Sequence, residues 1–72
     1  MQYQVFDHII NIENEKINTY GIVLYVNGCE ALRVYDVSTD YQAISDFVDS
    51  INKKHLDPFR LGESLEIFIN KN

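Results

Sequence analysis

The chain has 72 residues, of which 46% are apolar, and its formal net charge is −5. A chain this short has room for one core, so we expect a single domain over residues 1–72. Eleven acidic residues against six basic ones oppose binding to the phosphate backbone of nucleic acids. No apolar run approaches the roughly 18 residues of a membrane span. The first residues lack the pattern of a signal peptide, so the sequence predicts a cytoplasmic protein with no membrane partner.

The first element in the chain is a β-rich run from Tyr3 to Ile12. Its apolar side chains fall on both faces of the expected strand, and a bulge near Asp7 or Ile10 would account for that pattern. The polar stretch from Glu13 to Lys16 follows and predicts a turn. A meander is the simplest connection to the next strand.

The strongest local signal is Asn27-Gly28, which lies between two further β-rich runs. Asn tolerates the positive φ of a type I′ turn and Gly adopts it freely, so we expect a two-residue hairpin here. The flanking strands should run from about Tyr20 to Val26 and from about Cys29 to Val37.

Counting back from this turn gives the pairing of the two strands. One face should carry Leu24 opposite Ala31, Ile22 opposite Arg33 and Tyr20 opposite Tyr35. The other face should carry Tyr25 opposite Glu30, Val23 opposite Leu32 and Gly21 opposite Val34. Both faces are substantially apolar, whereas an antiparallel sheet with one wet face alternates between apolar and polar positions. We therefore expect both faces to be covered, and the sequence leaves open which of them the helices cover.

After Val37 the apolar residues recur with the helical period, so the first helix begins there. Ser38 or Thr39 can cap it, and Thr39 with Gln42 matches the capping-box pattern. Its apolar stripe consists of Tyr41, Ile44, Phe47, Val48 and Ile51.

A second helix should run from Pro58 to about Asn70, with Asp57 as its N-cap. Ile67 falls off the apolar stripe of this helix and is therefore predicted to be exposed. The complete prediction is an α+β fold, with a three-stranded antiparallel meander followed by two helices. The residues predicted to face inward from the second helix are Leu61, Leu65, Phe68 and Ile69.

Several segments together resemble a family of short, uncharacterised bacterial proteins. They are Tyr20-Gly21-Ile22, Asp36-Val37-Ser38-Thr39-Asp40, Asn52 and Leu56-Asp57-Pro58-Phe59-Arg60-Leu61. The family carries Tyr-Gly-Ile, Asp-Ile-Ser-x-Asp, an Asn late in the first helix, and Leu-x-Pro-x-His-Leu. The resemblance extends from about Tyr20 to Ile69. This chain departs from the family pattern at Arg60, where the family has His, and at Ile67, where the family has an acidic residue. The resemblance implies the fold and leaves the function open.

Residues able to perform catalysis do not form a recognisable pattern. His8 and His55 have no Cys or carboxylate at a metal-ligand spacing. Cys29 is followed by Glu30, which does not activate a thiol. The three glycines are isolated, which argues against a phosphate-binding loop. We therefore expect no enzyme activity, no catalytic residue, no cofactor and no metal.

Two polar residues of the family pattern have structural explanations. Asp36 can accept hydrogen bonds from the N-terminus of the first helix or from a neighbouring loop. Asn52 can hydrogen-bond the turn from His55 to Asp57. The alternative is that Asp36 belongs to a ligand-binding pocket, with this protein acting as a small enzyme or ligand-binding domain.

The apolar surplus of the predicted hairpin favours a protein-interaction or regulatory module. Small sheets with a second apolar face often complete their core with a copy of themselves, and symmetric dimers are the commonest oligomers. We therefore expect a homodimer formed through an apolar sheet face. The predicted interaction surface consists of Val23, Tyr25, Leu32, Val34 and Ile67.

Overall fold

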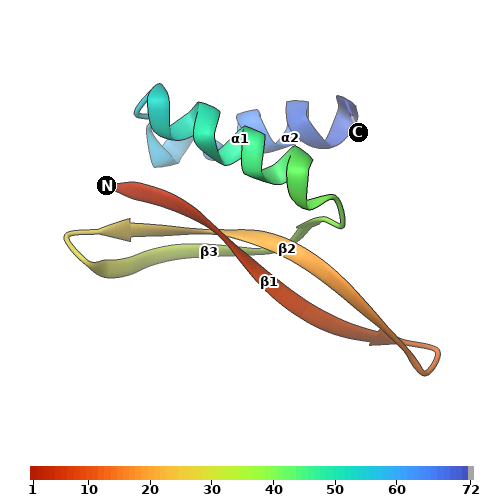
Figure 1. The fold of residues 1–72 in the computed structure, drawn as a ribbon. Coiled ribbons are helices and arrows are strands. Elements are labelled where there is room, and N and C mark those ends of the chain that lie inside the picture. The colour runs from red at the N-terminus through yellow and green to blue at the C-terminus, as the bar shows by residue number, and fades with distance from the viewer. Residues whose placement is uncertain (72) are drawn as a thin grey trace.

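The computed structural model describes residues 1–71. Within them the strands form an antiparallel meander in the order β1-β2-β3, and the two α-helices lie side by side over one face of the sheet (Figure 1). The predicted α+β fold is confirmed. The elements are β1 (Gln2–Ile12), β2 (Glu15–Val26), β3 (Cys29–Ser38), α1 (Tyr41–Lys53), a 3-10 helix η1 (Pro58–Arg60) and α2 (Leu61–Lys71).

Strands β1 and β2 form a long regular hairpin. Their pairing runs without interruption from Gln2 opposite Tyr25 to Ile12 opposite Glu15, so the bulge predicted in the first strand is wrong. The turn residues Glu13 and Asn14 both have positive φ, 50° and 67°, which is the backbone geometry that matches the twist of a two-residue hairpin.

The predicted hairpin at Asn27-Gly28 is confirmed, with positive φ at both residues. Its pairing follows the prediction only for the first two pairs, because the register shifts at Ala31. Leu24 lies opposite Leu32 rather than opposite Ala31. From Leu24 to Ile22 the pairing predicted from the sequence is wrong by one residue, since a bulge inserts an extra residue into one strand.

A second register shift lies farther along β3. Ile22 pairs with Val34 and Tyr20 pairs with Ser38, so residues 35–37 of β3 lie opposite Gly21 alone. Within this segment Asp36 has a φ of 54°, a conformation that Asp tolerates better than most residues. The bulge turns the Asp36 side chain toward the neighbouring strands.

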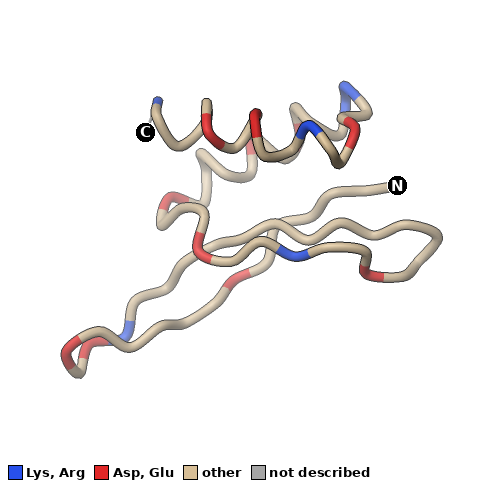
Figure 2. Tube along the Cα trace, turned by 180° about the vertical axis from the view of Figure 1, so that it is seen from behind, with Lys and Arg blue, Asp and Glu red and all other residues tan. Residues whose placement is uncertain are grey.

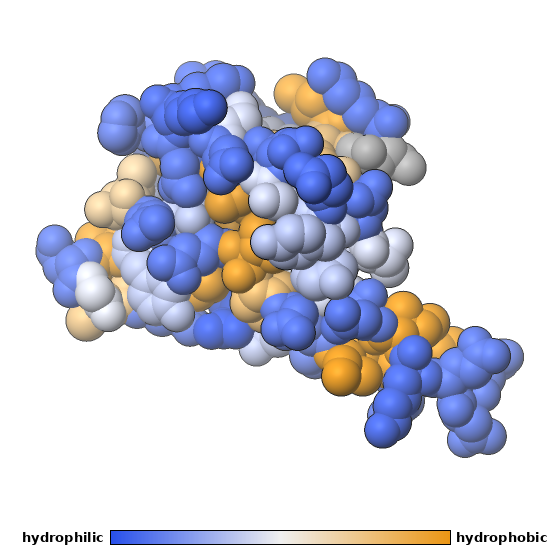
Figure 3. Space-filling model, viewed as in Figure 1, coloured by the Kyte–Doolittle hydropathy of each residue, from blue (hydrophilic) through white to orange (hydrophobic). Residues whose placement is uncertain are grey.

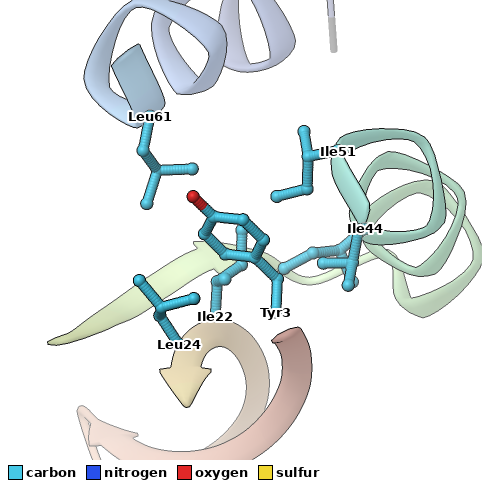
Figure 4. Close-up of a cluster of buried hydrophobic side chains, with 7 residues drawn as sticks. Tyr3, Ile22, Leu24, Ile44, Ile51 and Leu61 are labelled. Atoms are coloured by element: carbon cyan, nitrogen blue, oxygen red, sulfur yellow. The ribbon is translucent and has the colours of Figure 1, made fainter. Parts of the chain in front are cut away.

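The core fills the space between the sheet and the helices. The ring of Tyr3 lies at its centre (Figure 4). The Tyr3 hydroxyl donates a hydrogen bond to the carbonyl oxygen of Leu56 at 2.8 Å. Burial is the main cause that raises the pKa of this phenol. The buried residues of the core are Tyr3, Ile22, Leu24, Ile44, Val48, Ile51 and Leu61.

The register shift moves two residues of the predicted interaction surface into this core. Leu32 and Val34 lie opposite Leu24 and Ile22, and both pack against the buried cluster under the helices. The predicted set of five residues therefore does not form one surface.

Helix α1 is capped by Asp40, whose carboxylate accepts a hydrogen bond from the Ala43 N–H at 3.1 Å. The predicted caps, Ser38 and Thr39, are therefore wrong. The hydroxyl of Ser38 instead accepts from the Asp40 N–H and shapes the approach to the helix.

Asp57 caps the second helical segment as predicted, by accepting from the Phe59 N–H at 3.0 Å. Its first turn is the 3-10 helix η1, and the α-helix proper starts at Leu61. Ile67 is 59% exposed, as predicted, whereas Ile69 is 53% exposed and not part of the inward stripe.

The far end of the β1–β2 hairpin extends beyond the helices, as the lower right of Figure 1 shows. We call this projecting part, residues 9–17, the arm. No helix within residues 1–71 is long and apolar enough to cross a membrane.

Candidate interaction surface on the open sheet face

The sheet face that points away from the helices is called the open face. Its residues follow from strand alternation, since Tyr3, Ile22 and Leu24 point toward the helices. Of the predicted interaction surface, only Val23 and Tyr25 lie on this side. The open face carries Gln2, Gln4, Phe6, His8, Ile10 and Ile12 of β1, Glu15, Ile17, Thr19, Gly21, Val23 and Tyr25 of β2, and Glu30, Arg33, Tyr35 and Asp36 of β3.

The middle of the open face is filled by an aromatic cluster, which we define as Phe6, His8, Arg33 and Tyr35. The Phe6 ring lies over Gly21, where an added Cβ would come within 2.7 Å of the ring and would overlap the Val34 carbonyl oxygen. Tyr35 meets Phe6 edge-on at 5.3 Å between ring centroids. The close approach of Phe6 therefore requires glycine at position 21.

Arg33 extends this cluster toward the β2–β3 turn. Its guanidinium lies 4.4 Å from the centroid of the Phe6 ring and donates a hydrogen bond to Glu30 at 2.6 Å. The hydrogen bond lowers the pKa of Glu30 and raises that of Arg33. Val23 is only 3% exposed. It lies opposite Arg33 and Gln4, so its role as an exposed interaction residue is not supported.

A polar cluster at the second bulge joins three strands. The carboxylate of Asp36 accepts a hydrogen bond from the Thr19 hydroxyl and one from His8 Nδ1, the latter at 3.0 Å. These two bonds, the Thr19 bond first, lower the pKa of Asp36. The side-chain partners of Asp36 are therefore strand residues and not the helix N-terminus. This contact gives Asp36 a structural role.

A depression of about 340 Å³ lies beside Asp36. It is the place where the sequence suggested an alternative ligand pocket. The depression contains one carboxylate, three hydroxyl groups and two apolar side chains from the end of α2. No group of three or more His, Cys, Asp or Glu within residues 1–71 is arranged to hold a metal ion. The lining residues are Thr19, Asp36, Val37, Ser38, Thr39, Phe68 and Ile69.

The arm is amphipathic. Ile10, Ile12 and Ile17 point toward the open face, and Ile12 is 50% exposed. The opposite side of the arm holds one apolar residue, Ile9, among polar neighbours. In Figure 3 the hydrophobic residues of the arm form an orange patch next to its polar tip. The apolar side of the arm therefore continues the open face beyond the helices.

Charges lie at the two ends of the open face. The arm tip carries Glu13, Glu15 and Lys16, and the end at the β2–β3 turn carries the Glu30–Arg33 pair (Figure 2). Strand alternation puts Glu15 on the open face and Lys16 on the other side. The arm tip thus presents a carboxylate to the open face without a paired cation on the same side.

The remaining residue of the predicted surface, Ile67, lies in the helix layer. It borders a groove of about 390 Å³ between α1 and α2, where the rings of Phe47 and Phe68 pack at 4.7 Å between centroids. Lys54 and Lys71 also line this groove. Ile67 is therefore separated from the open face by the core.

No family model matches this chain, and no curated protein and no solved structure is significantly similar to it. The function must therefore be argued from the surface itself. The sequence prediction missed Phe6, Ile12 and Ile17 as surface residues. The signal for the isoleucines was their position beside the polar stretch that forms the first turn.

Proposed function

We propose that this protein is a small protein-interaction module that forms a homodimer through its open face. The observation that carries the proposal is the apolar side of the arm. It is formed by Ile10, Ile12 and Ile17 on a two-stranded ribbon that α1 and α2 do not cover. A two-stranded hairpin is at best marginally stable in water by itself. A second copy on this side would bury the isoleucines and stabilise the arm.

The area of the open face is compatible with binding of a second copy. Three strands about 4.8 Å apart are roughly 14 Å wide, and a strand the length of β1 extends about 36 Å. The flat footprint is therefore about 500 Å², before the relief of the side chains is counted. Specific interfaces bury about 800 Å² of accessible surface on each partner. The flat footprints of two copies together are about 1,000 Å², which is near the lower limit of specific interfaces and fits a weak dimer that dissociates on dilution.

The charges of the open face also suit a second copy. Two of its carboxylates, Glu30 and Asp36, are already hydrogen-bonded to Arg33 and His8. Only Glu15 remains without such a partner on this side. Much of the net charge of −5 therefore lies away from the open face and does not oppose its burial.

Light scattering over a hundredfold dilution tests the proposal. The wild-type mass should move from twice 8.4 kDa toward 8.4 kDa as the protein is diluted. Ile12→Asp should shift the transition to higher concentration by tenfold or more, because it places a charge in the interface. Ile67→Asp is the matched control, with the same substitution at a similar exposure in the helix layer. A monomeric wild type at every concentration, or equal effects of both variants, would contradict the proposal.

The depression beside Asp36 favours a second candidate function, binding of a small ligand with an ammonium or guanidinium group. The lowered pKa of Asp36 keeps its carboxylate charged at neutral pH. We propose binding rather than catalysis, because the Thr19 hydroxyl is bonded to Asp36 and to the His8 backbone carbonyl oxygen, and not to the His8 ring as a nucleophile would be. NMR titration with methylguanidine should shift amides of residues 36–39 in the wild type and not in Asp36→Asn. Equal shifts in both proteins would exclude this candidate.

A further inference from the structure

We propose that the two copies stack their open faces with the strands antiparallel, so that the arm of each copy covers the Cys29 end of the other. The Cys29 end is the β2–β3 turn with the adjacent Glu30 and Arg33. This inference rests on the homodimer proposed above and specifies its geometry. It names which residues of one copy meet which residues of the other.

Two kinds of two-fold axis bring the open faces together. An axis along the strands places arm on arm and Cys29 end on Cys29 end. An axis across the strands places each arm on the Cys29 end of the other copy. Both are closed symmetric arrangements, and both allow the aligned packing of two sheets about 10 Å apart. The distribution of side chains along the open face has to decide between them.

The charges favour the axis across the strands. With the axis along the central strand β2, Glu15 at one arm tip would face Glu15 of the other copy. Like charges brought together in an interface oppose association. With the axis across the strands, Glu15 faces the end that holds the Glu30–Arg33 pair, in which the two charges offset each other. The repulsion between the two tips is then removed.

The packing is consistent with the same choice. The middle of β2 is at Tyr20 and Gly21, so a full overlap of antiparallel sheets places the axis next to Phe6. The aromatic cluster of each copy then packs on that of the other. Ile17 of the arm falls over the part of the partner that holds Val23 and Tyr25. The half-buried Tyr25 gives this end an apolar surface for the isoleucines.

Thiol cross-linking tests the arrangement, because Cys29 is exposed and is the chain's only cysteine. Glu13→Cys adds a thiol at the arm tip, where the residue already has positive φ, so the turn takes on no new strain. Residues 13 and 29 lie at opposite ends of β2, about 36 Å apart, beyond the reach of a bismaleimide spanning about 10 Å within one chain. A link between them must therefore join two copies.

Three proteins are compared at a concentration where light scattering shows the dimer. Glu13→Cys with Cys29 retained should give a cross-linked dimer whose linked peptides contain positions 13 and 29. The wild type and Glu13→Cys/Cys29→Ser each have one thiol, and in the antiparallel dimer they should give less than a tenth of that product.

The possible results separate this inference from the homodimer itself. Strong cross-linking of either single-thiol protein would overturn the antiparallel arrangement and leave the dimer in place. A dimeric mass without a link between positions 13 and 29 would also overturn it. A monomeric mass for the wild type would instead contradict the proposed function. A dominant link between positions 13 and 29 would establish the arrangement.

Discussion

The side-chain amide of Asn52 hydrogen-bonds both backbone groups of Tyr3. Asn52 Oδ1 accepts from the Tyr3 N–H and Asn52 Nδ2 donates to the Tyr3 carbonyl oxygen, each at 2.8 Å. The amide thus occupies the outer edge of β1 in the way that a neighbouring strand would. Asn52 was predicted to hydrogen-bond the turn from His55 to Asp57, and its backbone carbonyl oxygen accepts from the His55 N–H at 3.1 Å. Its observed side-chain partner is the first strand.

Replacement of Asn52 by Ala should lower the free energy of unfolding by about 2 kcal/mol, since two partly buried backbone groups lose their partners. Urea denaturation at a fixed protein concentration measures the change. Asn18→Ala is the control, because Asn18 makes one exposed hydrogen bond to the Tyr20 hydroxyl, and it should change stability by less than about 0.5 kcal/mol. Equal effects of the two variants would show that the Asn52 contact adds nothing.

Two glycine-to-alanine substitutions should act in opposite directions. Gly21→Ala should destabilise the fold by about 3 kcal/mol, because the new methyl group meets the Phe6 ring and the Val34 carbonyl oxygen. Gly62→Ala should stabilise it by about 0.5 to 1 kcal/mol, because the position is helical and open. Thermal unfolding of both variants checks the prediction. A neutral Gly21→Ala would mean that Phe6 does not lie over residue 21.

The turn between β1 and β2 can be made more stable by substitution. Glu13 pays a steric cost for its positive φ of 50°, and Asn-Gly is the pair that best suits this turn. The double variant Glu13→Asn/Asn14→Gly should therefore raise the free energy of unfolding by about 1 kcal/mol. Hydrogen exchange of the arm amides should slow down in proportion. Unchanged exchange in the arm would contradict this account of the turn.

Stability should depend on the ionisation of Asp36 in acid. Its pKa is lower in the folded chain than the ordinary value of 3.8, so the ionised form favours folding. This contribution is fully present well above the ordinary pKa of 3.8 and is lost as the pH falls through the folded pKa. The urea midpoints of the wild type and Asp36→Asn should therefore differ at pH 7 and converge below pH 4.

Asp49→Asn is the matched control for this experiment. Asp49 is an exposed carboxylate of α1, and its replacement should change stability by less than about 0.5 kcal/mol at both pH values. A constant gap between the wild type and Asp36→Asn across the acid range would show that Asp36 does not gain from its contacts with Thr19 and His8.

Local signals in the sequence were sufficient for the order and type of the elements. The Asn27-Gly28 turn, the helical period after Val37 and the Asp57 cap each depend on residues close in the chain. The N-cap of α1 was missed by one or two positions, because Ser38, Thr39 and Asp40 are all good capping residues. Only the backbone conformation shows that Asp40 is the residue at the helix start.

The residues on each face of β3 could not be predicted correctly, because side-chain alternation is sensitive to a single inserted residue. The bulge at Ala31 exchanges the two faces of β3 and moves Leu32 and Val34 under the helices. The residues around Ala31 contain no pattern that predicts a bulge. The exposure of the arm was also not predicted, because it depends on where the helices pack. They cover the other end of the sheet and leave the apolar residues of the arm exposed to solvent.

The contacts of Tyr3 also determine when, during synthesis, the first strand can be joined to the helical part of the chain. Its partners Asn52 and Leu56 lie 49 and 53 residues farther along the chain. On the ribosome, the first strand must therefore wait for most of the chain to emerge before it gains these bonds. Both hairpins, β1–β2 and β2–β3, can form early from neighbouring residues, whereas the bonds at the outer edge of β1 form among the last contacts. Contacts this distant in sequence slow folding, and nascent chains that end before Asn52 should leave the edge of β1 open to other chains.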